Sequence, residues 1–270
     1  MSARTAHAIA DPASLRPFLA EDAVASAYML GDLDPLYAGY CTWYASAVED
    51  SVDSVLLVYE GLSAPTVLTH GTVEGQAAIL EAFVHDLPDH AHAHLGGRHA
   101  ELFASHFELR STRIMSRMAA RRDQLTLPAP DPTAPVVALG HRDTAELMEL
   151  SRHYPESFFE PSQLSSGHYY GVRRDGRLVS MAGVHSVNAV EGLAVLGNVV
   201  THPDARGHGL STACTGHLCG RLAADGFSLL ALNVERANRA AVRVYEKLGF
   251  REHHHYLEAS LARTLAHRVR

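Results

Sequence analysis

The chain is poor in the features that define several classes of protein. It has three cysteines in 270 residues, Cys41, Cys214 and Cys219, with no CxxC spacing. This odd number excludes a complete disulfide framework and indicates reduced thiols in a cytoplasmic protein. There is no basic excess either, and the net charge of −7 argues against a dedicated nucleic-acid binder. No apolar run approaches the length that crosses a bilayer, and we expect no secretory peptide at the first residues.

What is present fits a globular protein with a real core. Hydrophobic residues make up 47% of the chain and charged residues 20%. A stretch with four prolines, residues 121–135, is typical of a semi-rigid linker. We therefore predict an N-terminal mixed α/β domain over 1–120 and a second domain over 136–270.

Histidine is abundant, with 19 copies, and His90, His92 and His94 alternate. Alternate residues share one face of a strand, so these side chains either bind a metal or line a solvated strand face. No acidic or cysteine partner stands at the spacing of a ligand set, and we predict the solvated face and no metal.

The order of elements in the second half is regular. An Asp-Gly pair at Asp175 and Gly176 predicts a hairpin, and Asp143 with Glu146 predicts a capping box at the start of a helix. The apolar pattern predicts a strand over 193–201, a helix after Leu210, a strand over 227–234, a helix over 238–248 and a strand over 250–259.

A glycine-rich turn, residues 206–209, joins the strand over 193–201 to the helix that follows. Such a turn points unpaired backbone N–H groups outward, and the helix dipole adds partial positive charge at the same place. These are the requirements of a phosphate or pyrophosphate site.

Two motifs occur in a fixed order: Arg206-x-x-Gly209-x-Ser211, and Asn238-x-x-Ala241-x-x-x-Tyr245-x-x-x-Gly249-Phe250. Together, over roughly 134–260, they resemble the GNAT superfamily of acyl-CoA-dependent N-acetyltransferases. The resemblance implies a mixed α/β fold with a mostly antiparallel central sheet flanked by helices. The first 120 residues are expected to add a smaller α/β domain. One departure is Ser211, where the family usually has glycine or alanine.

The resemblance implies coenzyme A as the bound group, with the turn on its pyrophosphate and the strand over 193–201 along its pantetheine arm. That strand and the strand over 227–234 must then splay apart. The implied cofactor-binding residues are Val199, Val200, Thr201, Arg206, Gly207, His208, Gly209, Leu210, Ser211, Thr212, Asn233, Asn238 and Ala241.

The family's reaction is direct attack of a neutral amine on an acetyl or short acyl thioester, and it implies Tyr245 as the acid that protonates the thiolate. The phenol pKa near ~10 and the thiol pKa near ~8.5 make that transfer feasible. The base is left open; the candidates are Glu156, Glu160, His185, His202 and Glu235, of which His185 and Glu235 lie on or beside predicted strands. Cys214 and Cys219 are interpreted as packing residues.

The first half contains no phosphate-type loop. Its layout is similar to tandem acyltransferases whose first copy has lost its cofactor turn, and to the glycine N-acyltransferase-like branch. We expect it to be catalytically silent and to cover part of the acceptor site.

The predicted partner is a small-molecule or peptide amine, with no nucleic acid or membrane and a homodimer left open. The alternative function is a silent acyl-CoA-binding sensor or interaction module. The segment 154–167, with Phe158 and Phe159, is predicted to form an apolar wall of the pocket that binds the acceptor amine.

Overall fold

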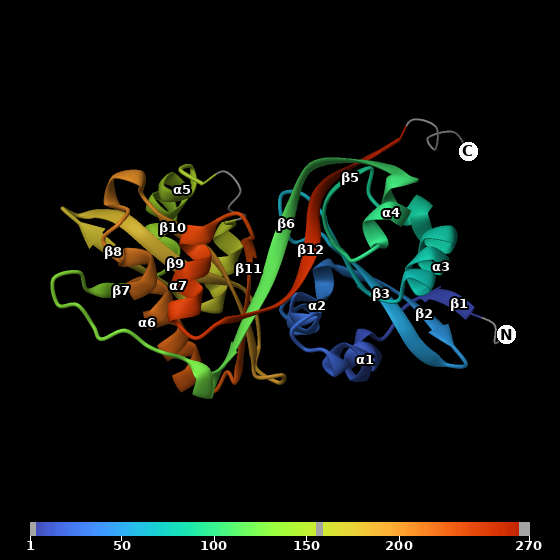
Figure 1. The fold of residues 1–270 in the computed structure, drawn as a ribbon, viewed down its shortest axis with the longest axis horizontal. Coiled ribbons are helices and arrows are strands. Elements are labelled where there is room, and N and C mark those ends of the chain that lie inside the picture. The colour runs from blue at the N-terminus through green and yellow to red at the C-terminus, as the bar shows by residue number, and fades with distance from the viewer. Residues whose placement is uncertain (1–3, 155–158, 265–270) are drawn as a thin grey trace. The chain divides into compact units, whose positions relative to one another are not determined.

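A computed structural model describes residues 4–154 and 159–264 (Figure 1). The chain forms two compact units, each treated by itself. Unit 1 comprises residues 1–117 and 254–270, and unit 2 comprises residues 118–253. The expected boundary near residue 120 is close to the observed one, but the end of the chain belongs to unit 1. The N-terminal unit is nearly as long as the second, not smaller.

Unit 1 is a mixed α/β unit in which the strand order is β1-β2-β3-β4-β5-β12. Neighbours are antiparallel except β4 and β5, which are parallel. Its elements are β1 (Arg4–Ala8), α1 (Arg16–Glu21), α2 (Ala27–Asp32), β2 (Cys41–Val48), β3 (Ser51–Tyr59), β4 (Thr66–Gly71), α3 (Val73–Phe83), β5 (His90–Gly96), α4 (His99–Ala104) and the first part of β6 (Phe107–Arg121).

Alternation along β5 explains how unit 1 forms its core. Ala91, Ala93 and Leu95 are buried and pack with Ile79 of α3 and Phe103 of α4. The histidines between them share the opposite face, as the alternation predicted, but only His90 is exposed; His92 and His94 are half-buried, and His94 contacts Glu258. Within the described ranges, no group of three or more His, Cys, Asp or Glu side chains is placed to hold a metal.

Unit 2 repeats the same plan with the strand order β11-β10-β9-β8-β7. Only β10 and β11 are parallel. Its elements are β7 (Val136–Leu139), α5 (Thr144–Ser151), β8 (Tyr169–Arg174), β9 (Arg177–Asn188), β10 (Leu193–Thr201), α6 (Leu210–Ala224), β11 (Leu229–Glu235), α7 (Arg239–Lys247) and the start of β12 (Arg251–Arg263).

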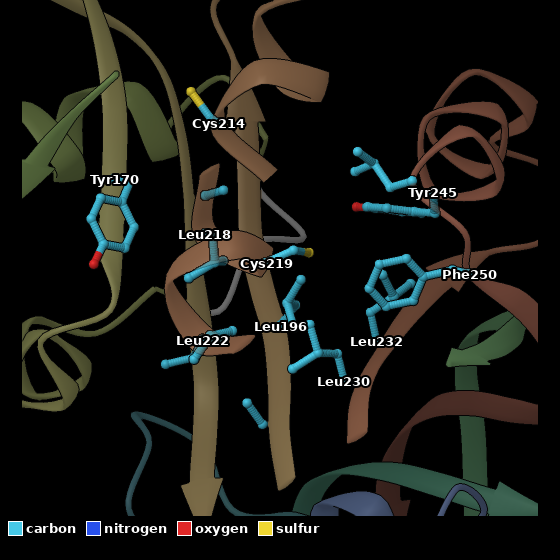
Figure 2. Packing of buried hydrophobic residues seen from close by; sticks show 14 of the residues in the cluster. Tyr170, Leu196, Cys214, Leu218, Cys219, Leu222, Leu230, Leu232, Tyr245 and Phe250 are labelled. Carbon is cyan, nitrogen blue, oxygen red and sulfur yellow. The ribbon is translucent and has the colours of Figure 1, made fainter. Parts of the chain in front are cut away.

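The helices of unit 2 cover both faces of this sheet. Cys214, Leu218 and Leu222 of α6 pack with Leu196 of β10 and Leu230 of β11 in one buried cluster (Figure 2). A second cluster on the other face contains Leu147 and Leu150 of α5 with Met181 and Val200. Mixed α/β structure with a mostly antiparallel sheet is therefore confirmed.

One local prediction at the start of α5 is wrong. Asp143 makes no capping bond to α5; its carboxylate accepts hydrogen bonds from Gly140 N–H, at 2.9 Å, and from Arg173, at 2.7 Å. Glu146 also pairs with Arg173. The guanidinium on β8 competes with the helix N–H groups for both carboxylates, because a charge-assisted bond is the stronger one. The Asp175–Gly176 hairpin is confirmed, and both residues have positive φ.

No helix among the described residues is both long and apolar enough to span a membrane.

Candidate active site

The site of unit 2 begins where the parallel pair β10 and β11 separates. The two strands pair from Leu193 with Leu229 to Leu196 with Leu232, but β10 continues to Thr201 and β11 to Glu235. The splay expected from the sequence is confirmed. Backbone N–H and C=O groups of β10 beyond Leu196 have no partner in β11, which suits an extended ligand that adds to the strand edge.

A β-bulge lies directly beyond the split. The register between β10 and β9 shifts between Gly197 and Val200, and Asn198 has a φ of 52° inside the strand. Asn198 is 6% exposed, and its Nδ2 donates to Tyr169 Oη at 2.8 Å and to Gln163 Oε1 at 2.9 Å. Tyr169 in turn donates to Val184 C=O at 3.0 Å. This network holds a left-handed residue in place and fixes the bulge directly beyond the split, while β10 stays paired with β9 at Val200 and Thr201.

The turn after β10 opens α6 through two glycines. Gly207 has a φ of 79° and Gly209, the residue before α6, a φ of 74°. A Cβ at either position would meet no atom within 4 Å, so the space in front of the turn is open. His208 Nδ1 contacts Arg206 C=O at 2.9 Å, and Arg206 Nε donates to Thr201 C=O at 3.3 Å. The turn is thus braced by its own side chains and presents the N-terminus of α6 to an anion.

The remaining predicted cofactor residues lie on the same elements. Val200 and Leu210 are buried, and Thr201 is tied to Ser180 by a 2.8 Å hydroxyl contact. Ser211 and Thr212 form the first turn of α6 and are half-buried. Asn233 follows Leu232 on β11, and its buried Oδ1 has no hydrogen-bond donor among the described residues. An N–H of a bound thioester arm would satisfy this acceptor, so the residues present fit acetyl-CoA.

Helix α7 supplies the predicted acid. Asn238 caps the helix, with its Oδ1 accepting from Ala241 N–H at 3.1 Å. Tyr245 is 7% exposed, and its ring lies beside that of Phe250, the ring centroids being 6.1 Å apart (Figure 2). It belongs to the cluster that contains Leu196 and Leu232, the last paired residues of β10 and β11. The structure therefore brings Tyr245 into the same cluster as the residues at the split.

Among the candidate bases, His185 lies against Gly197, the residue of β10 that follows the split. A Cβ on Gly197 would lie 2.0 Å from the His185 ring, so this imidazole fills the space that Gly197 leaves. Its Nδ1 contacts Gln163 Nε2 at 3.3 Å. Burial lowers the pKa of His185 to about 4, so the ring is neutral at pH 7.

The other candidates are more dispersed. Glu235 is half-buried at the end of β11. His202 accepts from Asp204 N–H at 3.2 Å and packs against His153, the ring centroids being 4.3 Å apart. Glu160 precedes a short 3₁₀ turn, while Glu156 and Phe158 lie outside the described residues.

Cys214 and Cys219 are fully buried in the cluster between α6 and the sheet, as predicted. Burial raises the pKa of Cys214 to about 11 and that of Cys219 to about 12. Both remain thiols at neutral pH and are poor nucleophiles. Sequence reasoning missed Gln163, Tyr169 and Asn198. An asparagine after a glycine within an apolar strand was the available signal, since asparagine tolerates left-handed backbone.

These features define the class of the second unit. Residues 139–250 match the model of the acetyltransferase (GNAT) family, and they form a GNAT acetyltransferase domain. The chain as a whole is similar in fold to a tandem GNAT protein from the clavulanic acid biosynthesis pathway. The TM-score is 0.59 at 14% identity, and the match covers 96% of this chain and 98% of that one.

Two curated relatives are similar to parts of the chain. The mycothiol acetyltransferase of Streptomyces avermitilis is 35% identical over 107 residues, 39% of this chain and 32% of that protein. The [ribosomal protein bS18]-alanine N-acetyltransferase of Escherichia coli strain K12 is 41% identical over 59 residues, 22% of this chain and 40% of that protein. The chain thus matches about a third of the length of the former.

Proposed function

We propose that the chain transfers an acetyl group, or a short acyl group, from coenzyme A to an amine. The observation that carries this proposal is the split of β10 and β11, which opens beside the glycine turn and has Tyr245 in the cluster at its base. A small-molecule amine or a protein amine is the acceptor class suggested by the names of the two curated relatives.

The chain's own residues would bind and orient the reactants. The N–H groups at the start of α6 would hold the pyrophosphate, and the β10 edge from Val199 onward would hold the pantetheine. When bound, acetyl-CoA supplies the thioester carbon that an amine attacks. Holding that carbon against the amine accounts for much of the rate, because proximity removes an entropic cost.

In this proposal, side chains near the separation of β10 and β11 carry out the two proton transfers. Tyr245 would donate its phenolic proton to the leaving thiolate. His185 or Glu235 would accept the amine proton. The position of the His185 ring next to Gly197 supports His185, while a pKa of about 4 makes it a weak base. In this proposal unit 1 contributes no transfer activity of its own.

The test is thiol release from acetyl-CoA with a panel of amino acids, amino sugars, polyamines and peptide N-termini. We expect Tyr245→Phe to lower kcat by about 10²-fold, the lower range of general-acid effects, and to leave coenzyme A affinity nearly unchanged. Tyr170→Phe is the matched control, a tyrosine of the same cluster on β8. If coenzyme A binds but no amine is acetylated, the domain is a sensor. If coenzyme A does not protect the chain against thermal unfolding, the proposed site is wrong.

A further inference from the structure

Unit 1 contains its own opening between parallel strands. β4 and β5 pair only from Thr66 with His92 to Leu68 with His94, although β4 runs to Gly71. A cavity of about 310 Å³ lies where the pairing ends, lined by the ends of both strands, by α2, and by Arg117 and Tyr256. Thr69 bridges the strands through its hydroxyl, which accepts from Gly96 N–H at 3.1 Å. This volume is at the lower end for small-ligand sites.

The helix that follows β4 cannot hold a pyrophosphate. The carboxylate of Asp53 lies at the N-terminus of α3, bonded to Thr72 Oγ1 at 3.0 Å and to Arg4 at 2.6 Å. Burial pushes the pKa of Asp53 upward, but hydrogen bonds from Ser46, Arg4 and Thr72 outweigh burial and lower it. An Asp53 carboxylate therefore already occupies the place where an anion would bind, and it would repel a phosphate.

The cavity is nevertheless cationic, because of Arg117. This side chain is 3% exposed, and its Nη1 donates to the carbonyls of Ala25, at 3.0 Å, and Val24, at 3.4 Å. The guanidinium lies over the rings of Tyr28 and Tyr256, at 4.8 and 5.3 Å from their centroids. In residues 4–154 and 159–264, no acceptor bonds to its buried Nε.

Carboxylates lie near this cavity, since Asp22 acts electrostatically on His70 and Glu258 acts on Tyr256, but among the described residues none of them forms an ion pair with Arg117. The Glu258 carboxylate on β12 bonds to Arg113 instead and contacts His94 at 3.7 Å. Burial lowers the pKa of His70 and of His99 in the cavity wall, so both rings are neutral. A buried cation without an anion is costly, and a bound anion would relieve that cost.

We propose that this cavity binds a small organic acid, with its carboxylate on Arg117 and its apolar body against Met29 and Leu68. A planar carboxylate matches the fork of donors that a guanidinium presents. The buried side chains of Met29 and Leu68 line the same cavity and favour an aromatic or aliphatic body over a hydrated ion. The site does not depend on the proposed acetyl transfer in unit 2.

The experiment is calorimetric titration of the full-length chain with benzoate, benzyl alcohol and inorganic phosphate. We expect saturable benzoate binding in the millimolar range or tighter, with benzyl alcohol weaker by at least about tenfold, because it lacks the charge. Arg117→Lys keeps the charge but loses the fork, and we expect it to weaken benzoate by about tenfold. Arg110→Gln is the matched control, since Arg110 is an exposed arginine of β6 that does not line the cavity, and benzoate affinity should stay within about twofold.

A second variant leaves Arg117 intact. Ala25 lines the cavity and is half-buried, so Ala25→Phe should fill the space and abolish benzoate binding without touching a charge. Urea unfolding of each variant checks that it folds; if Arg117→Lys does not fold, Ala25→Phe decides alone. The proposal is overturned if phosphate competes with benzoate at equal affinity, if benzyl alcohol binds as well as benzoate, or if Ala25→Phe retains benzoate affinity.

Discussion

The bulge in β10 should depend on Asn198 for both its stability and its function. Asn198 combines a left-handed backbone at φ 52° with two buried hydrogen bonds, to Gln163 and Tyr169. Alanine at this position loses both bonds and also suffers in the left-handed conformation. Glycine loses both bonds but tolerates the backbone. Comparing the two variants therefore separates the contribution of the two hydrogen bonds from the cost of the left-handed backbone.

The magnitudes follow from these contacts. Each hydrogen bond contributes about 1 kcal/mol net, more where the remaining partner stays buried and unsatisfied. The left-handed conformation costs a non-glycine residue about 1 kcal/mol. We expect Asn198→Ala to lower the free energy of unfolding by about 3 kcal/mol, and Asn198→Gly by roughly 1 kcal/mol less.

Urea unfolding measures the loss of stability, and calorimetric titration with coenzyme A measures the effect on cofactor binding. Coenzyme A should bind more weakly to both variants, because the bulge that shapes β10 directly beyond the split would relax. Ser186→Ala is the control, a buried residue of β9 near this region. The reasoning is refuted if both Asn198 variants unfold within about 0.5 kcal/mol of the parent, the size of an ordinary surface effect.

Three further predictions concern other parts of the chain. For His185 the folded pKa of about 4 lies below the unfolded value of 6.5. It therefore contributes stability that is complete above pH 6.5 and is lost as pH falls toward 4; His185→Gln should remove up to about 3 kcal/mol of this acid sensitivity, measured by urea unfolding from pH 4 to 8. Gly209→Ala should weaken coenzyme A binding by at least about tenfold, whereas Gly176→Ala, at a nearly equal φ of 77°, should change only stability. A chain ending at residue 253 should lose hydrogen-exchange protection in β5, and one ending at residue 264 should keep it, because β5 pairs with β12.

Local patterns predicted unit 2 well because its motifs have direct physical meaning. Gly207 and Gly209 have the positive φ that a tight turn before a helix requires, and Asp175-Gly176 forms the expected hairpin. The helix ending at Gly249 also appears, one residue shorter at each end, as α7. In each case the backbone preference of the residue itself determines the local structure, and such a preference can be inferred directly from the sequence.

Long-range placement could not be predicted in the same way. Trp43 and Tyr44 lie in a stretch with no clear periodicity, yet they belong to β2, which pairs with β1 and β3 on its two edges, and Tyr44 is buried against α3. Asp143 was expected to cap a helix but bonds to Arg173, thirty residues away. The pairing of β12 with β5 joins residues far apart in the chain, and no local pattern encodes that choice.

The two units show how a few residues decide what one strand arrangement can bind. Both contain a parallel pair that separates after a short run of pairing, followed by a helix. In unit 2 two glycines leave the N-terminus of α6 open, whereas in unit 1 Thr72 and Asp53 close the N-terminus of α3. The backbone plan therefore does not determine the ligand. Among the described residues that line the cavity of unit 1, Arg117 is a buried cation, so the site proposed there would take a small anion, while the open helix end in unit 2 would suit a pyrophosphate.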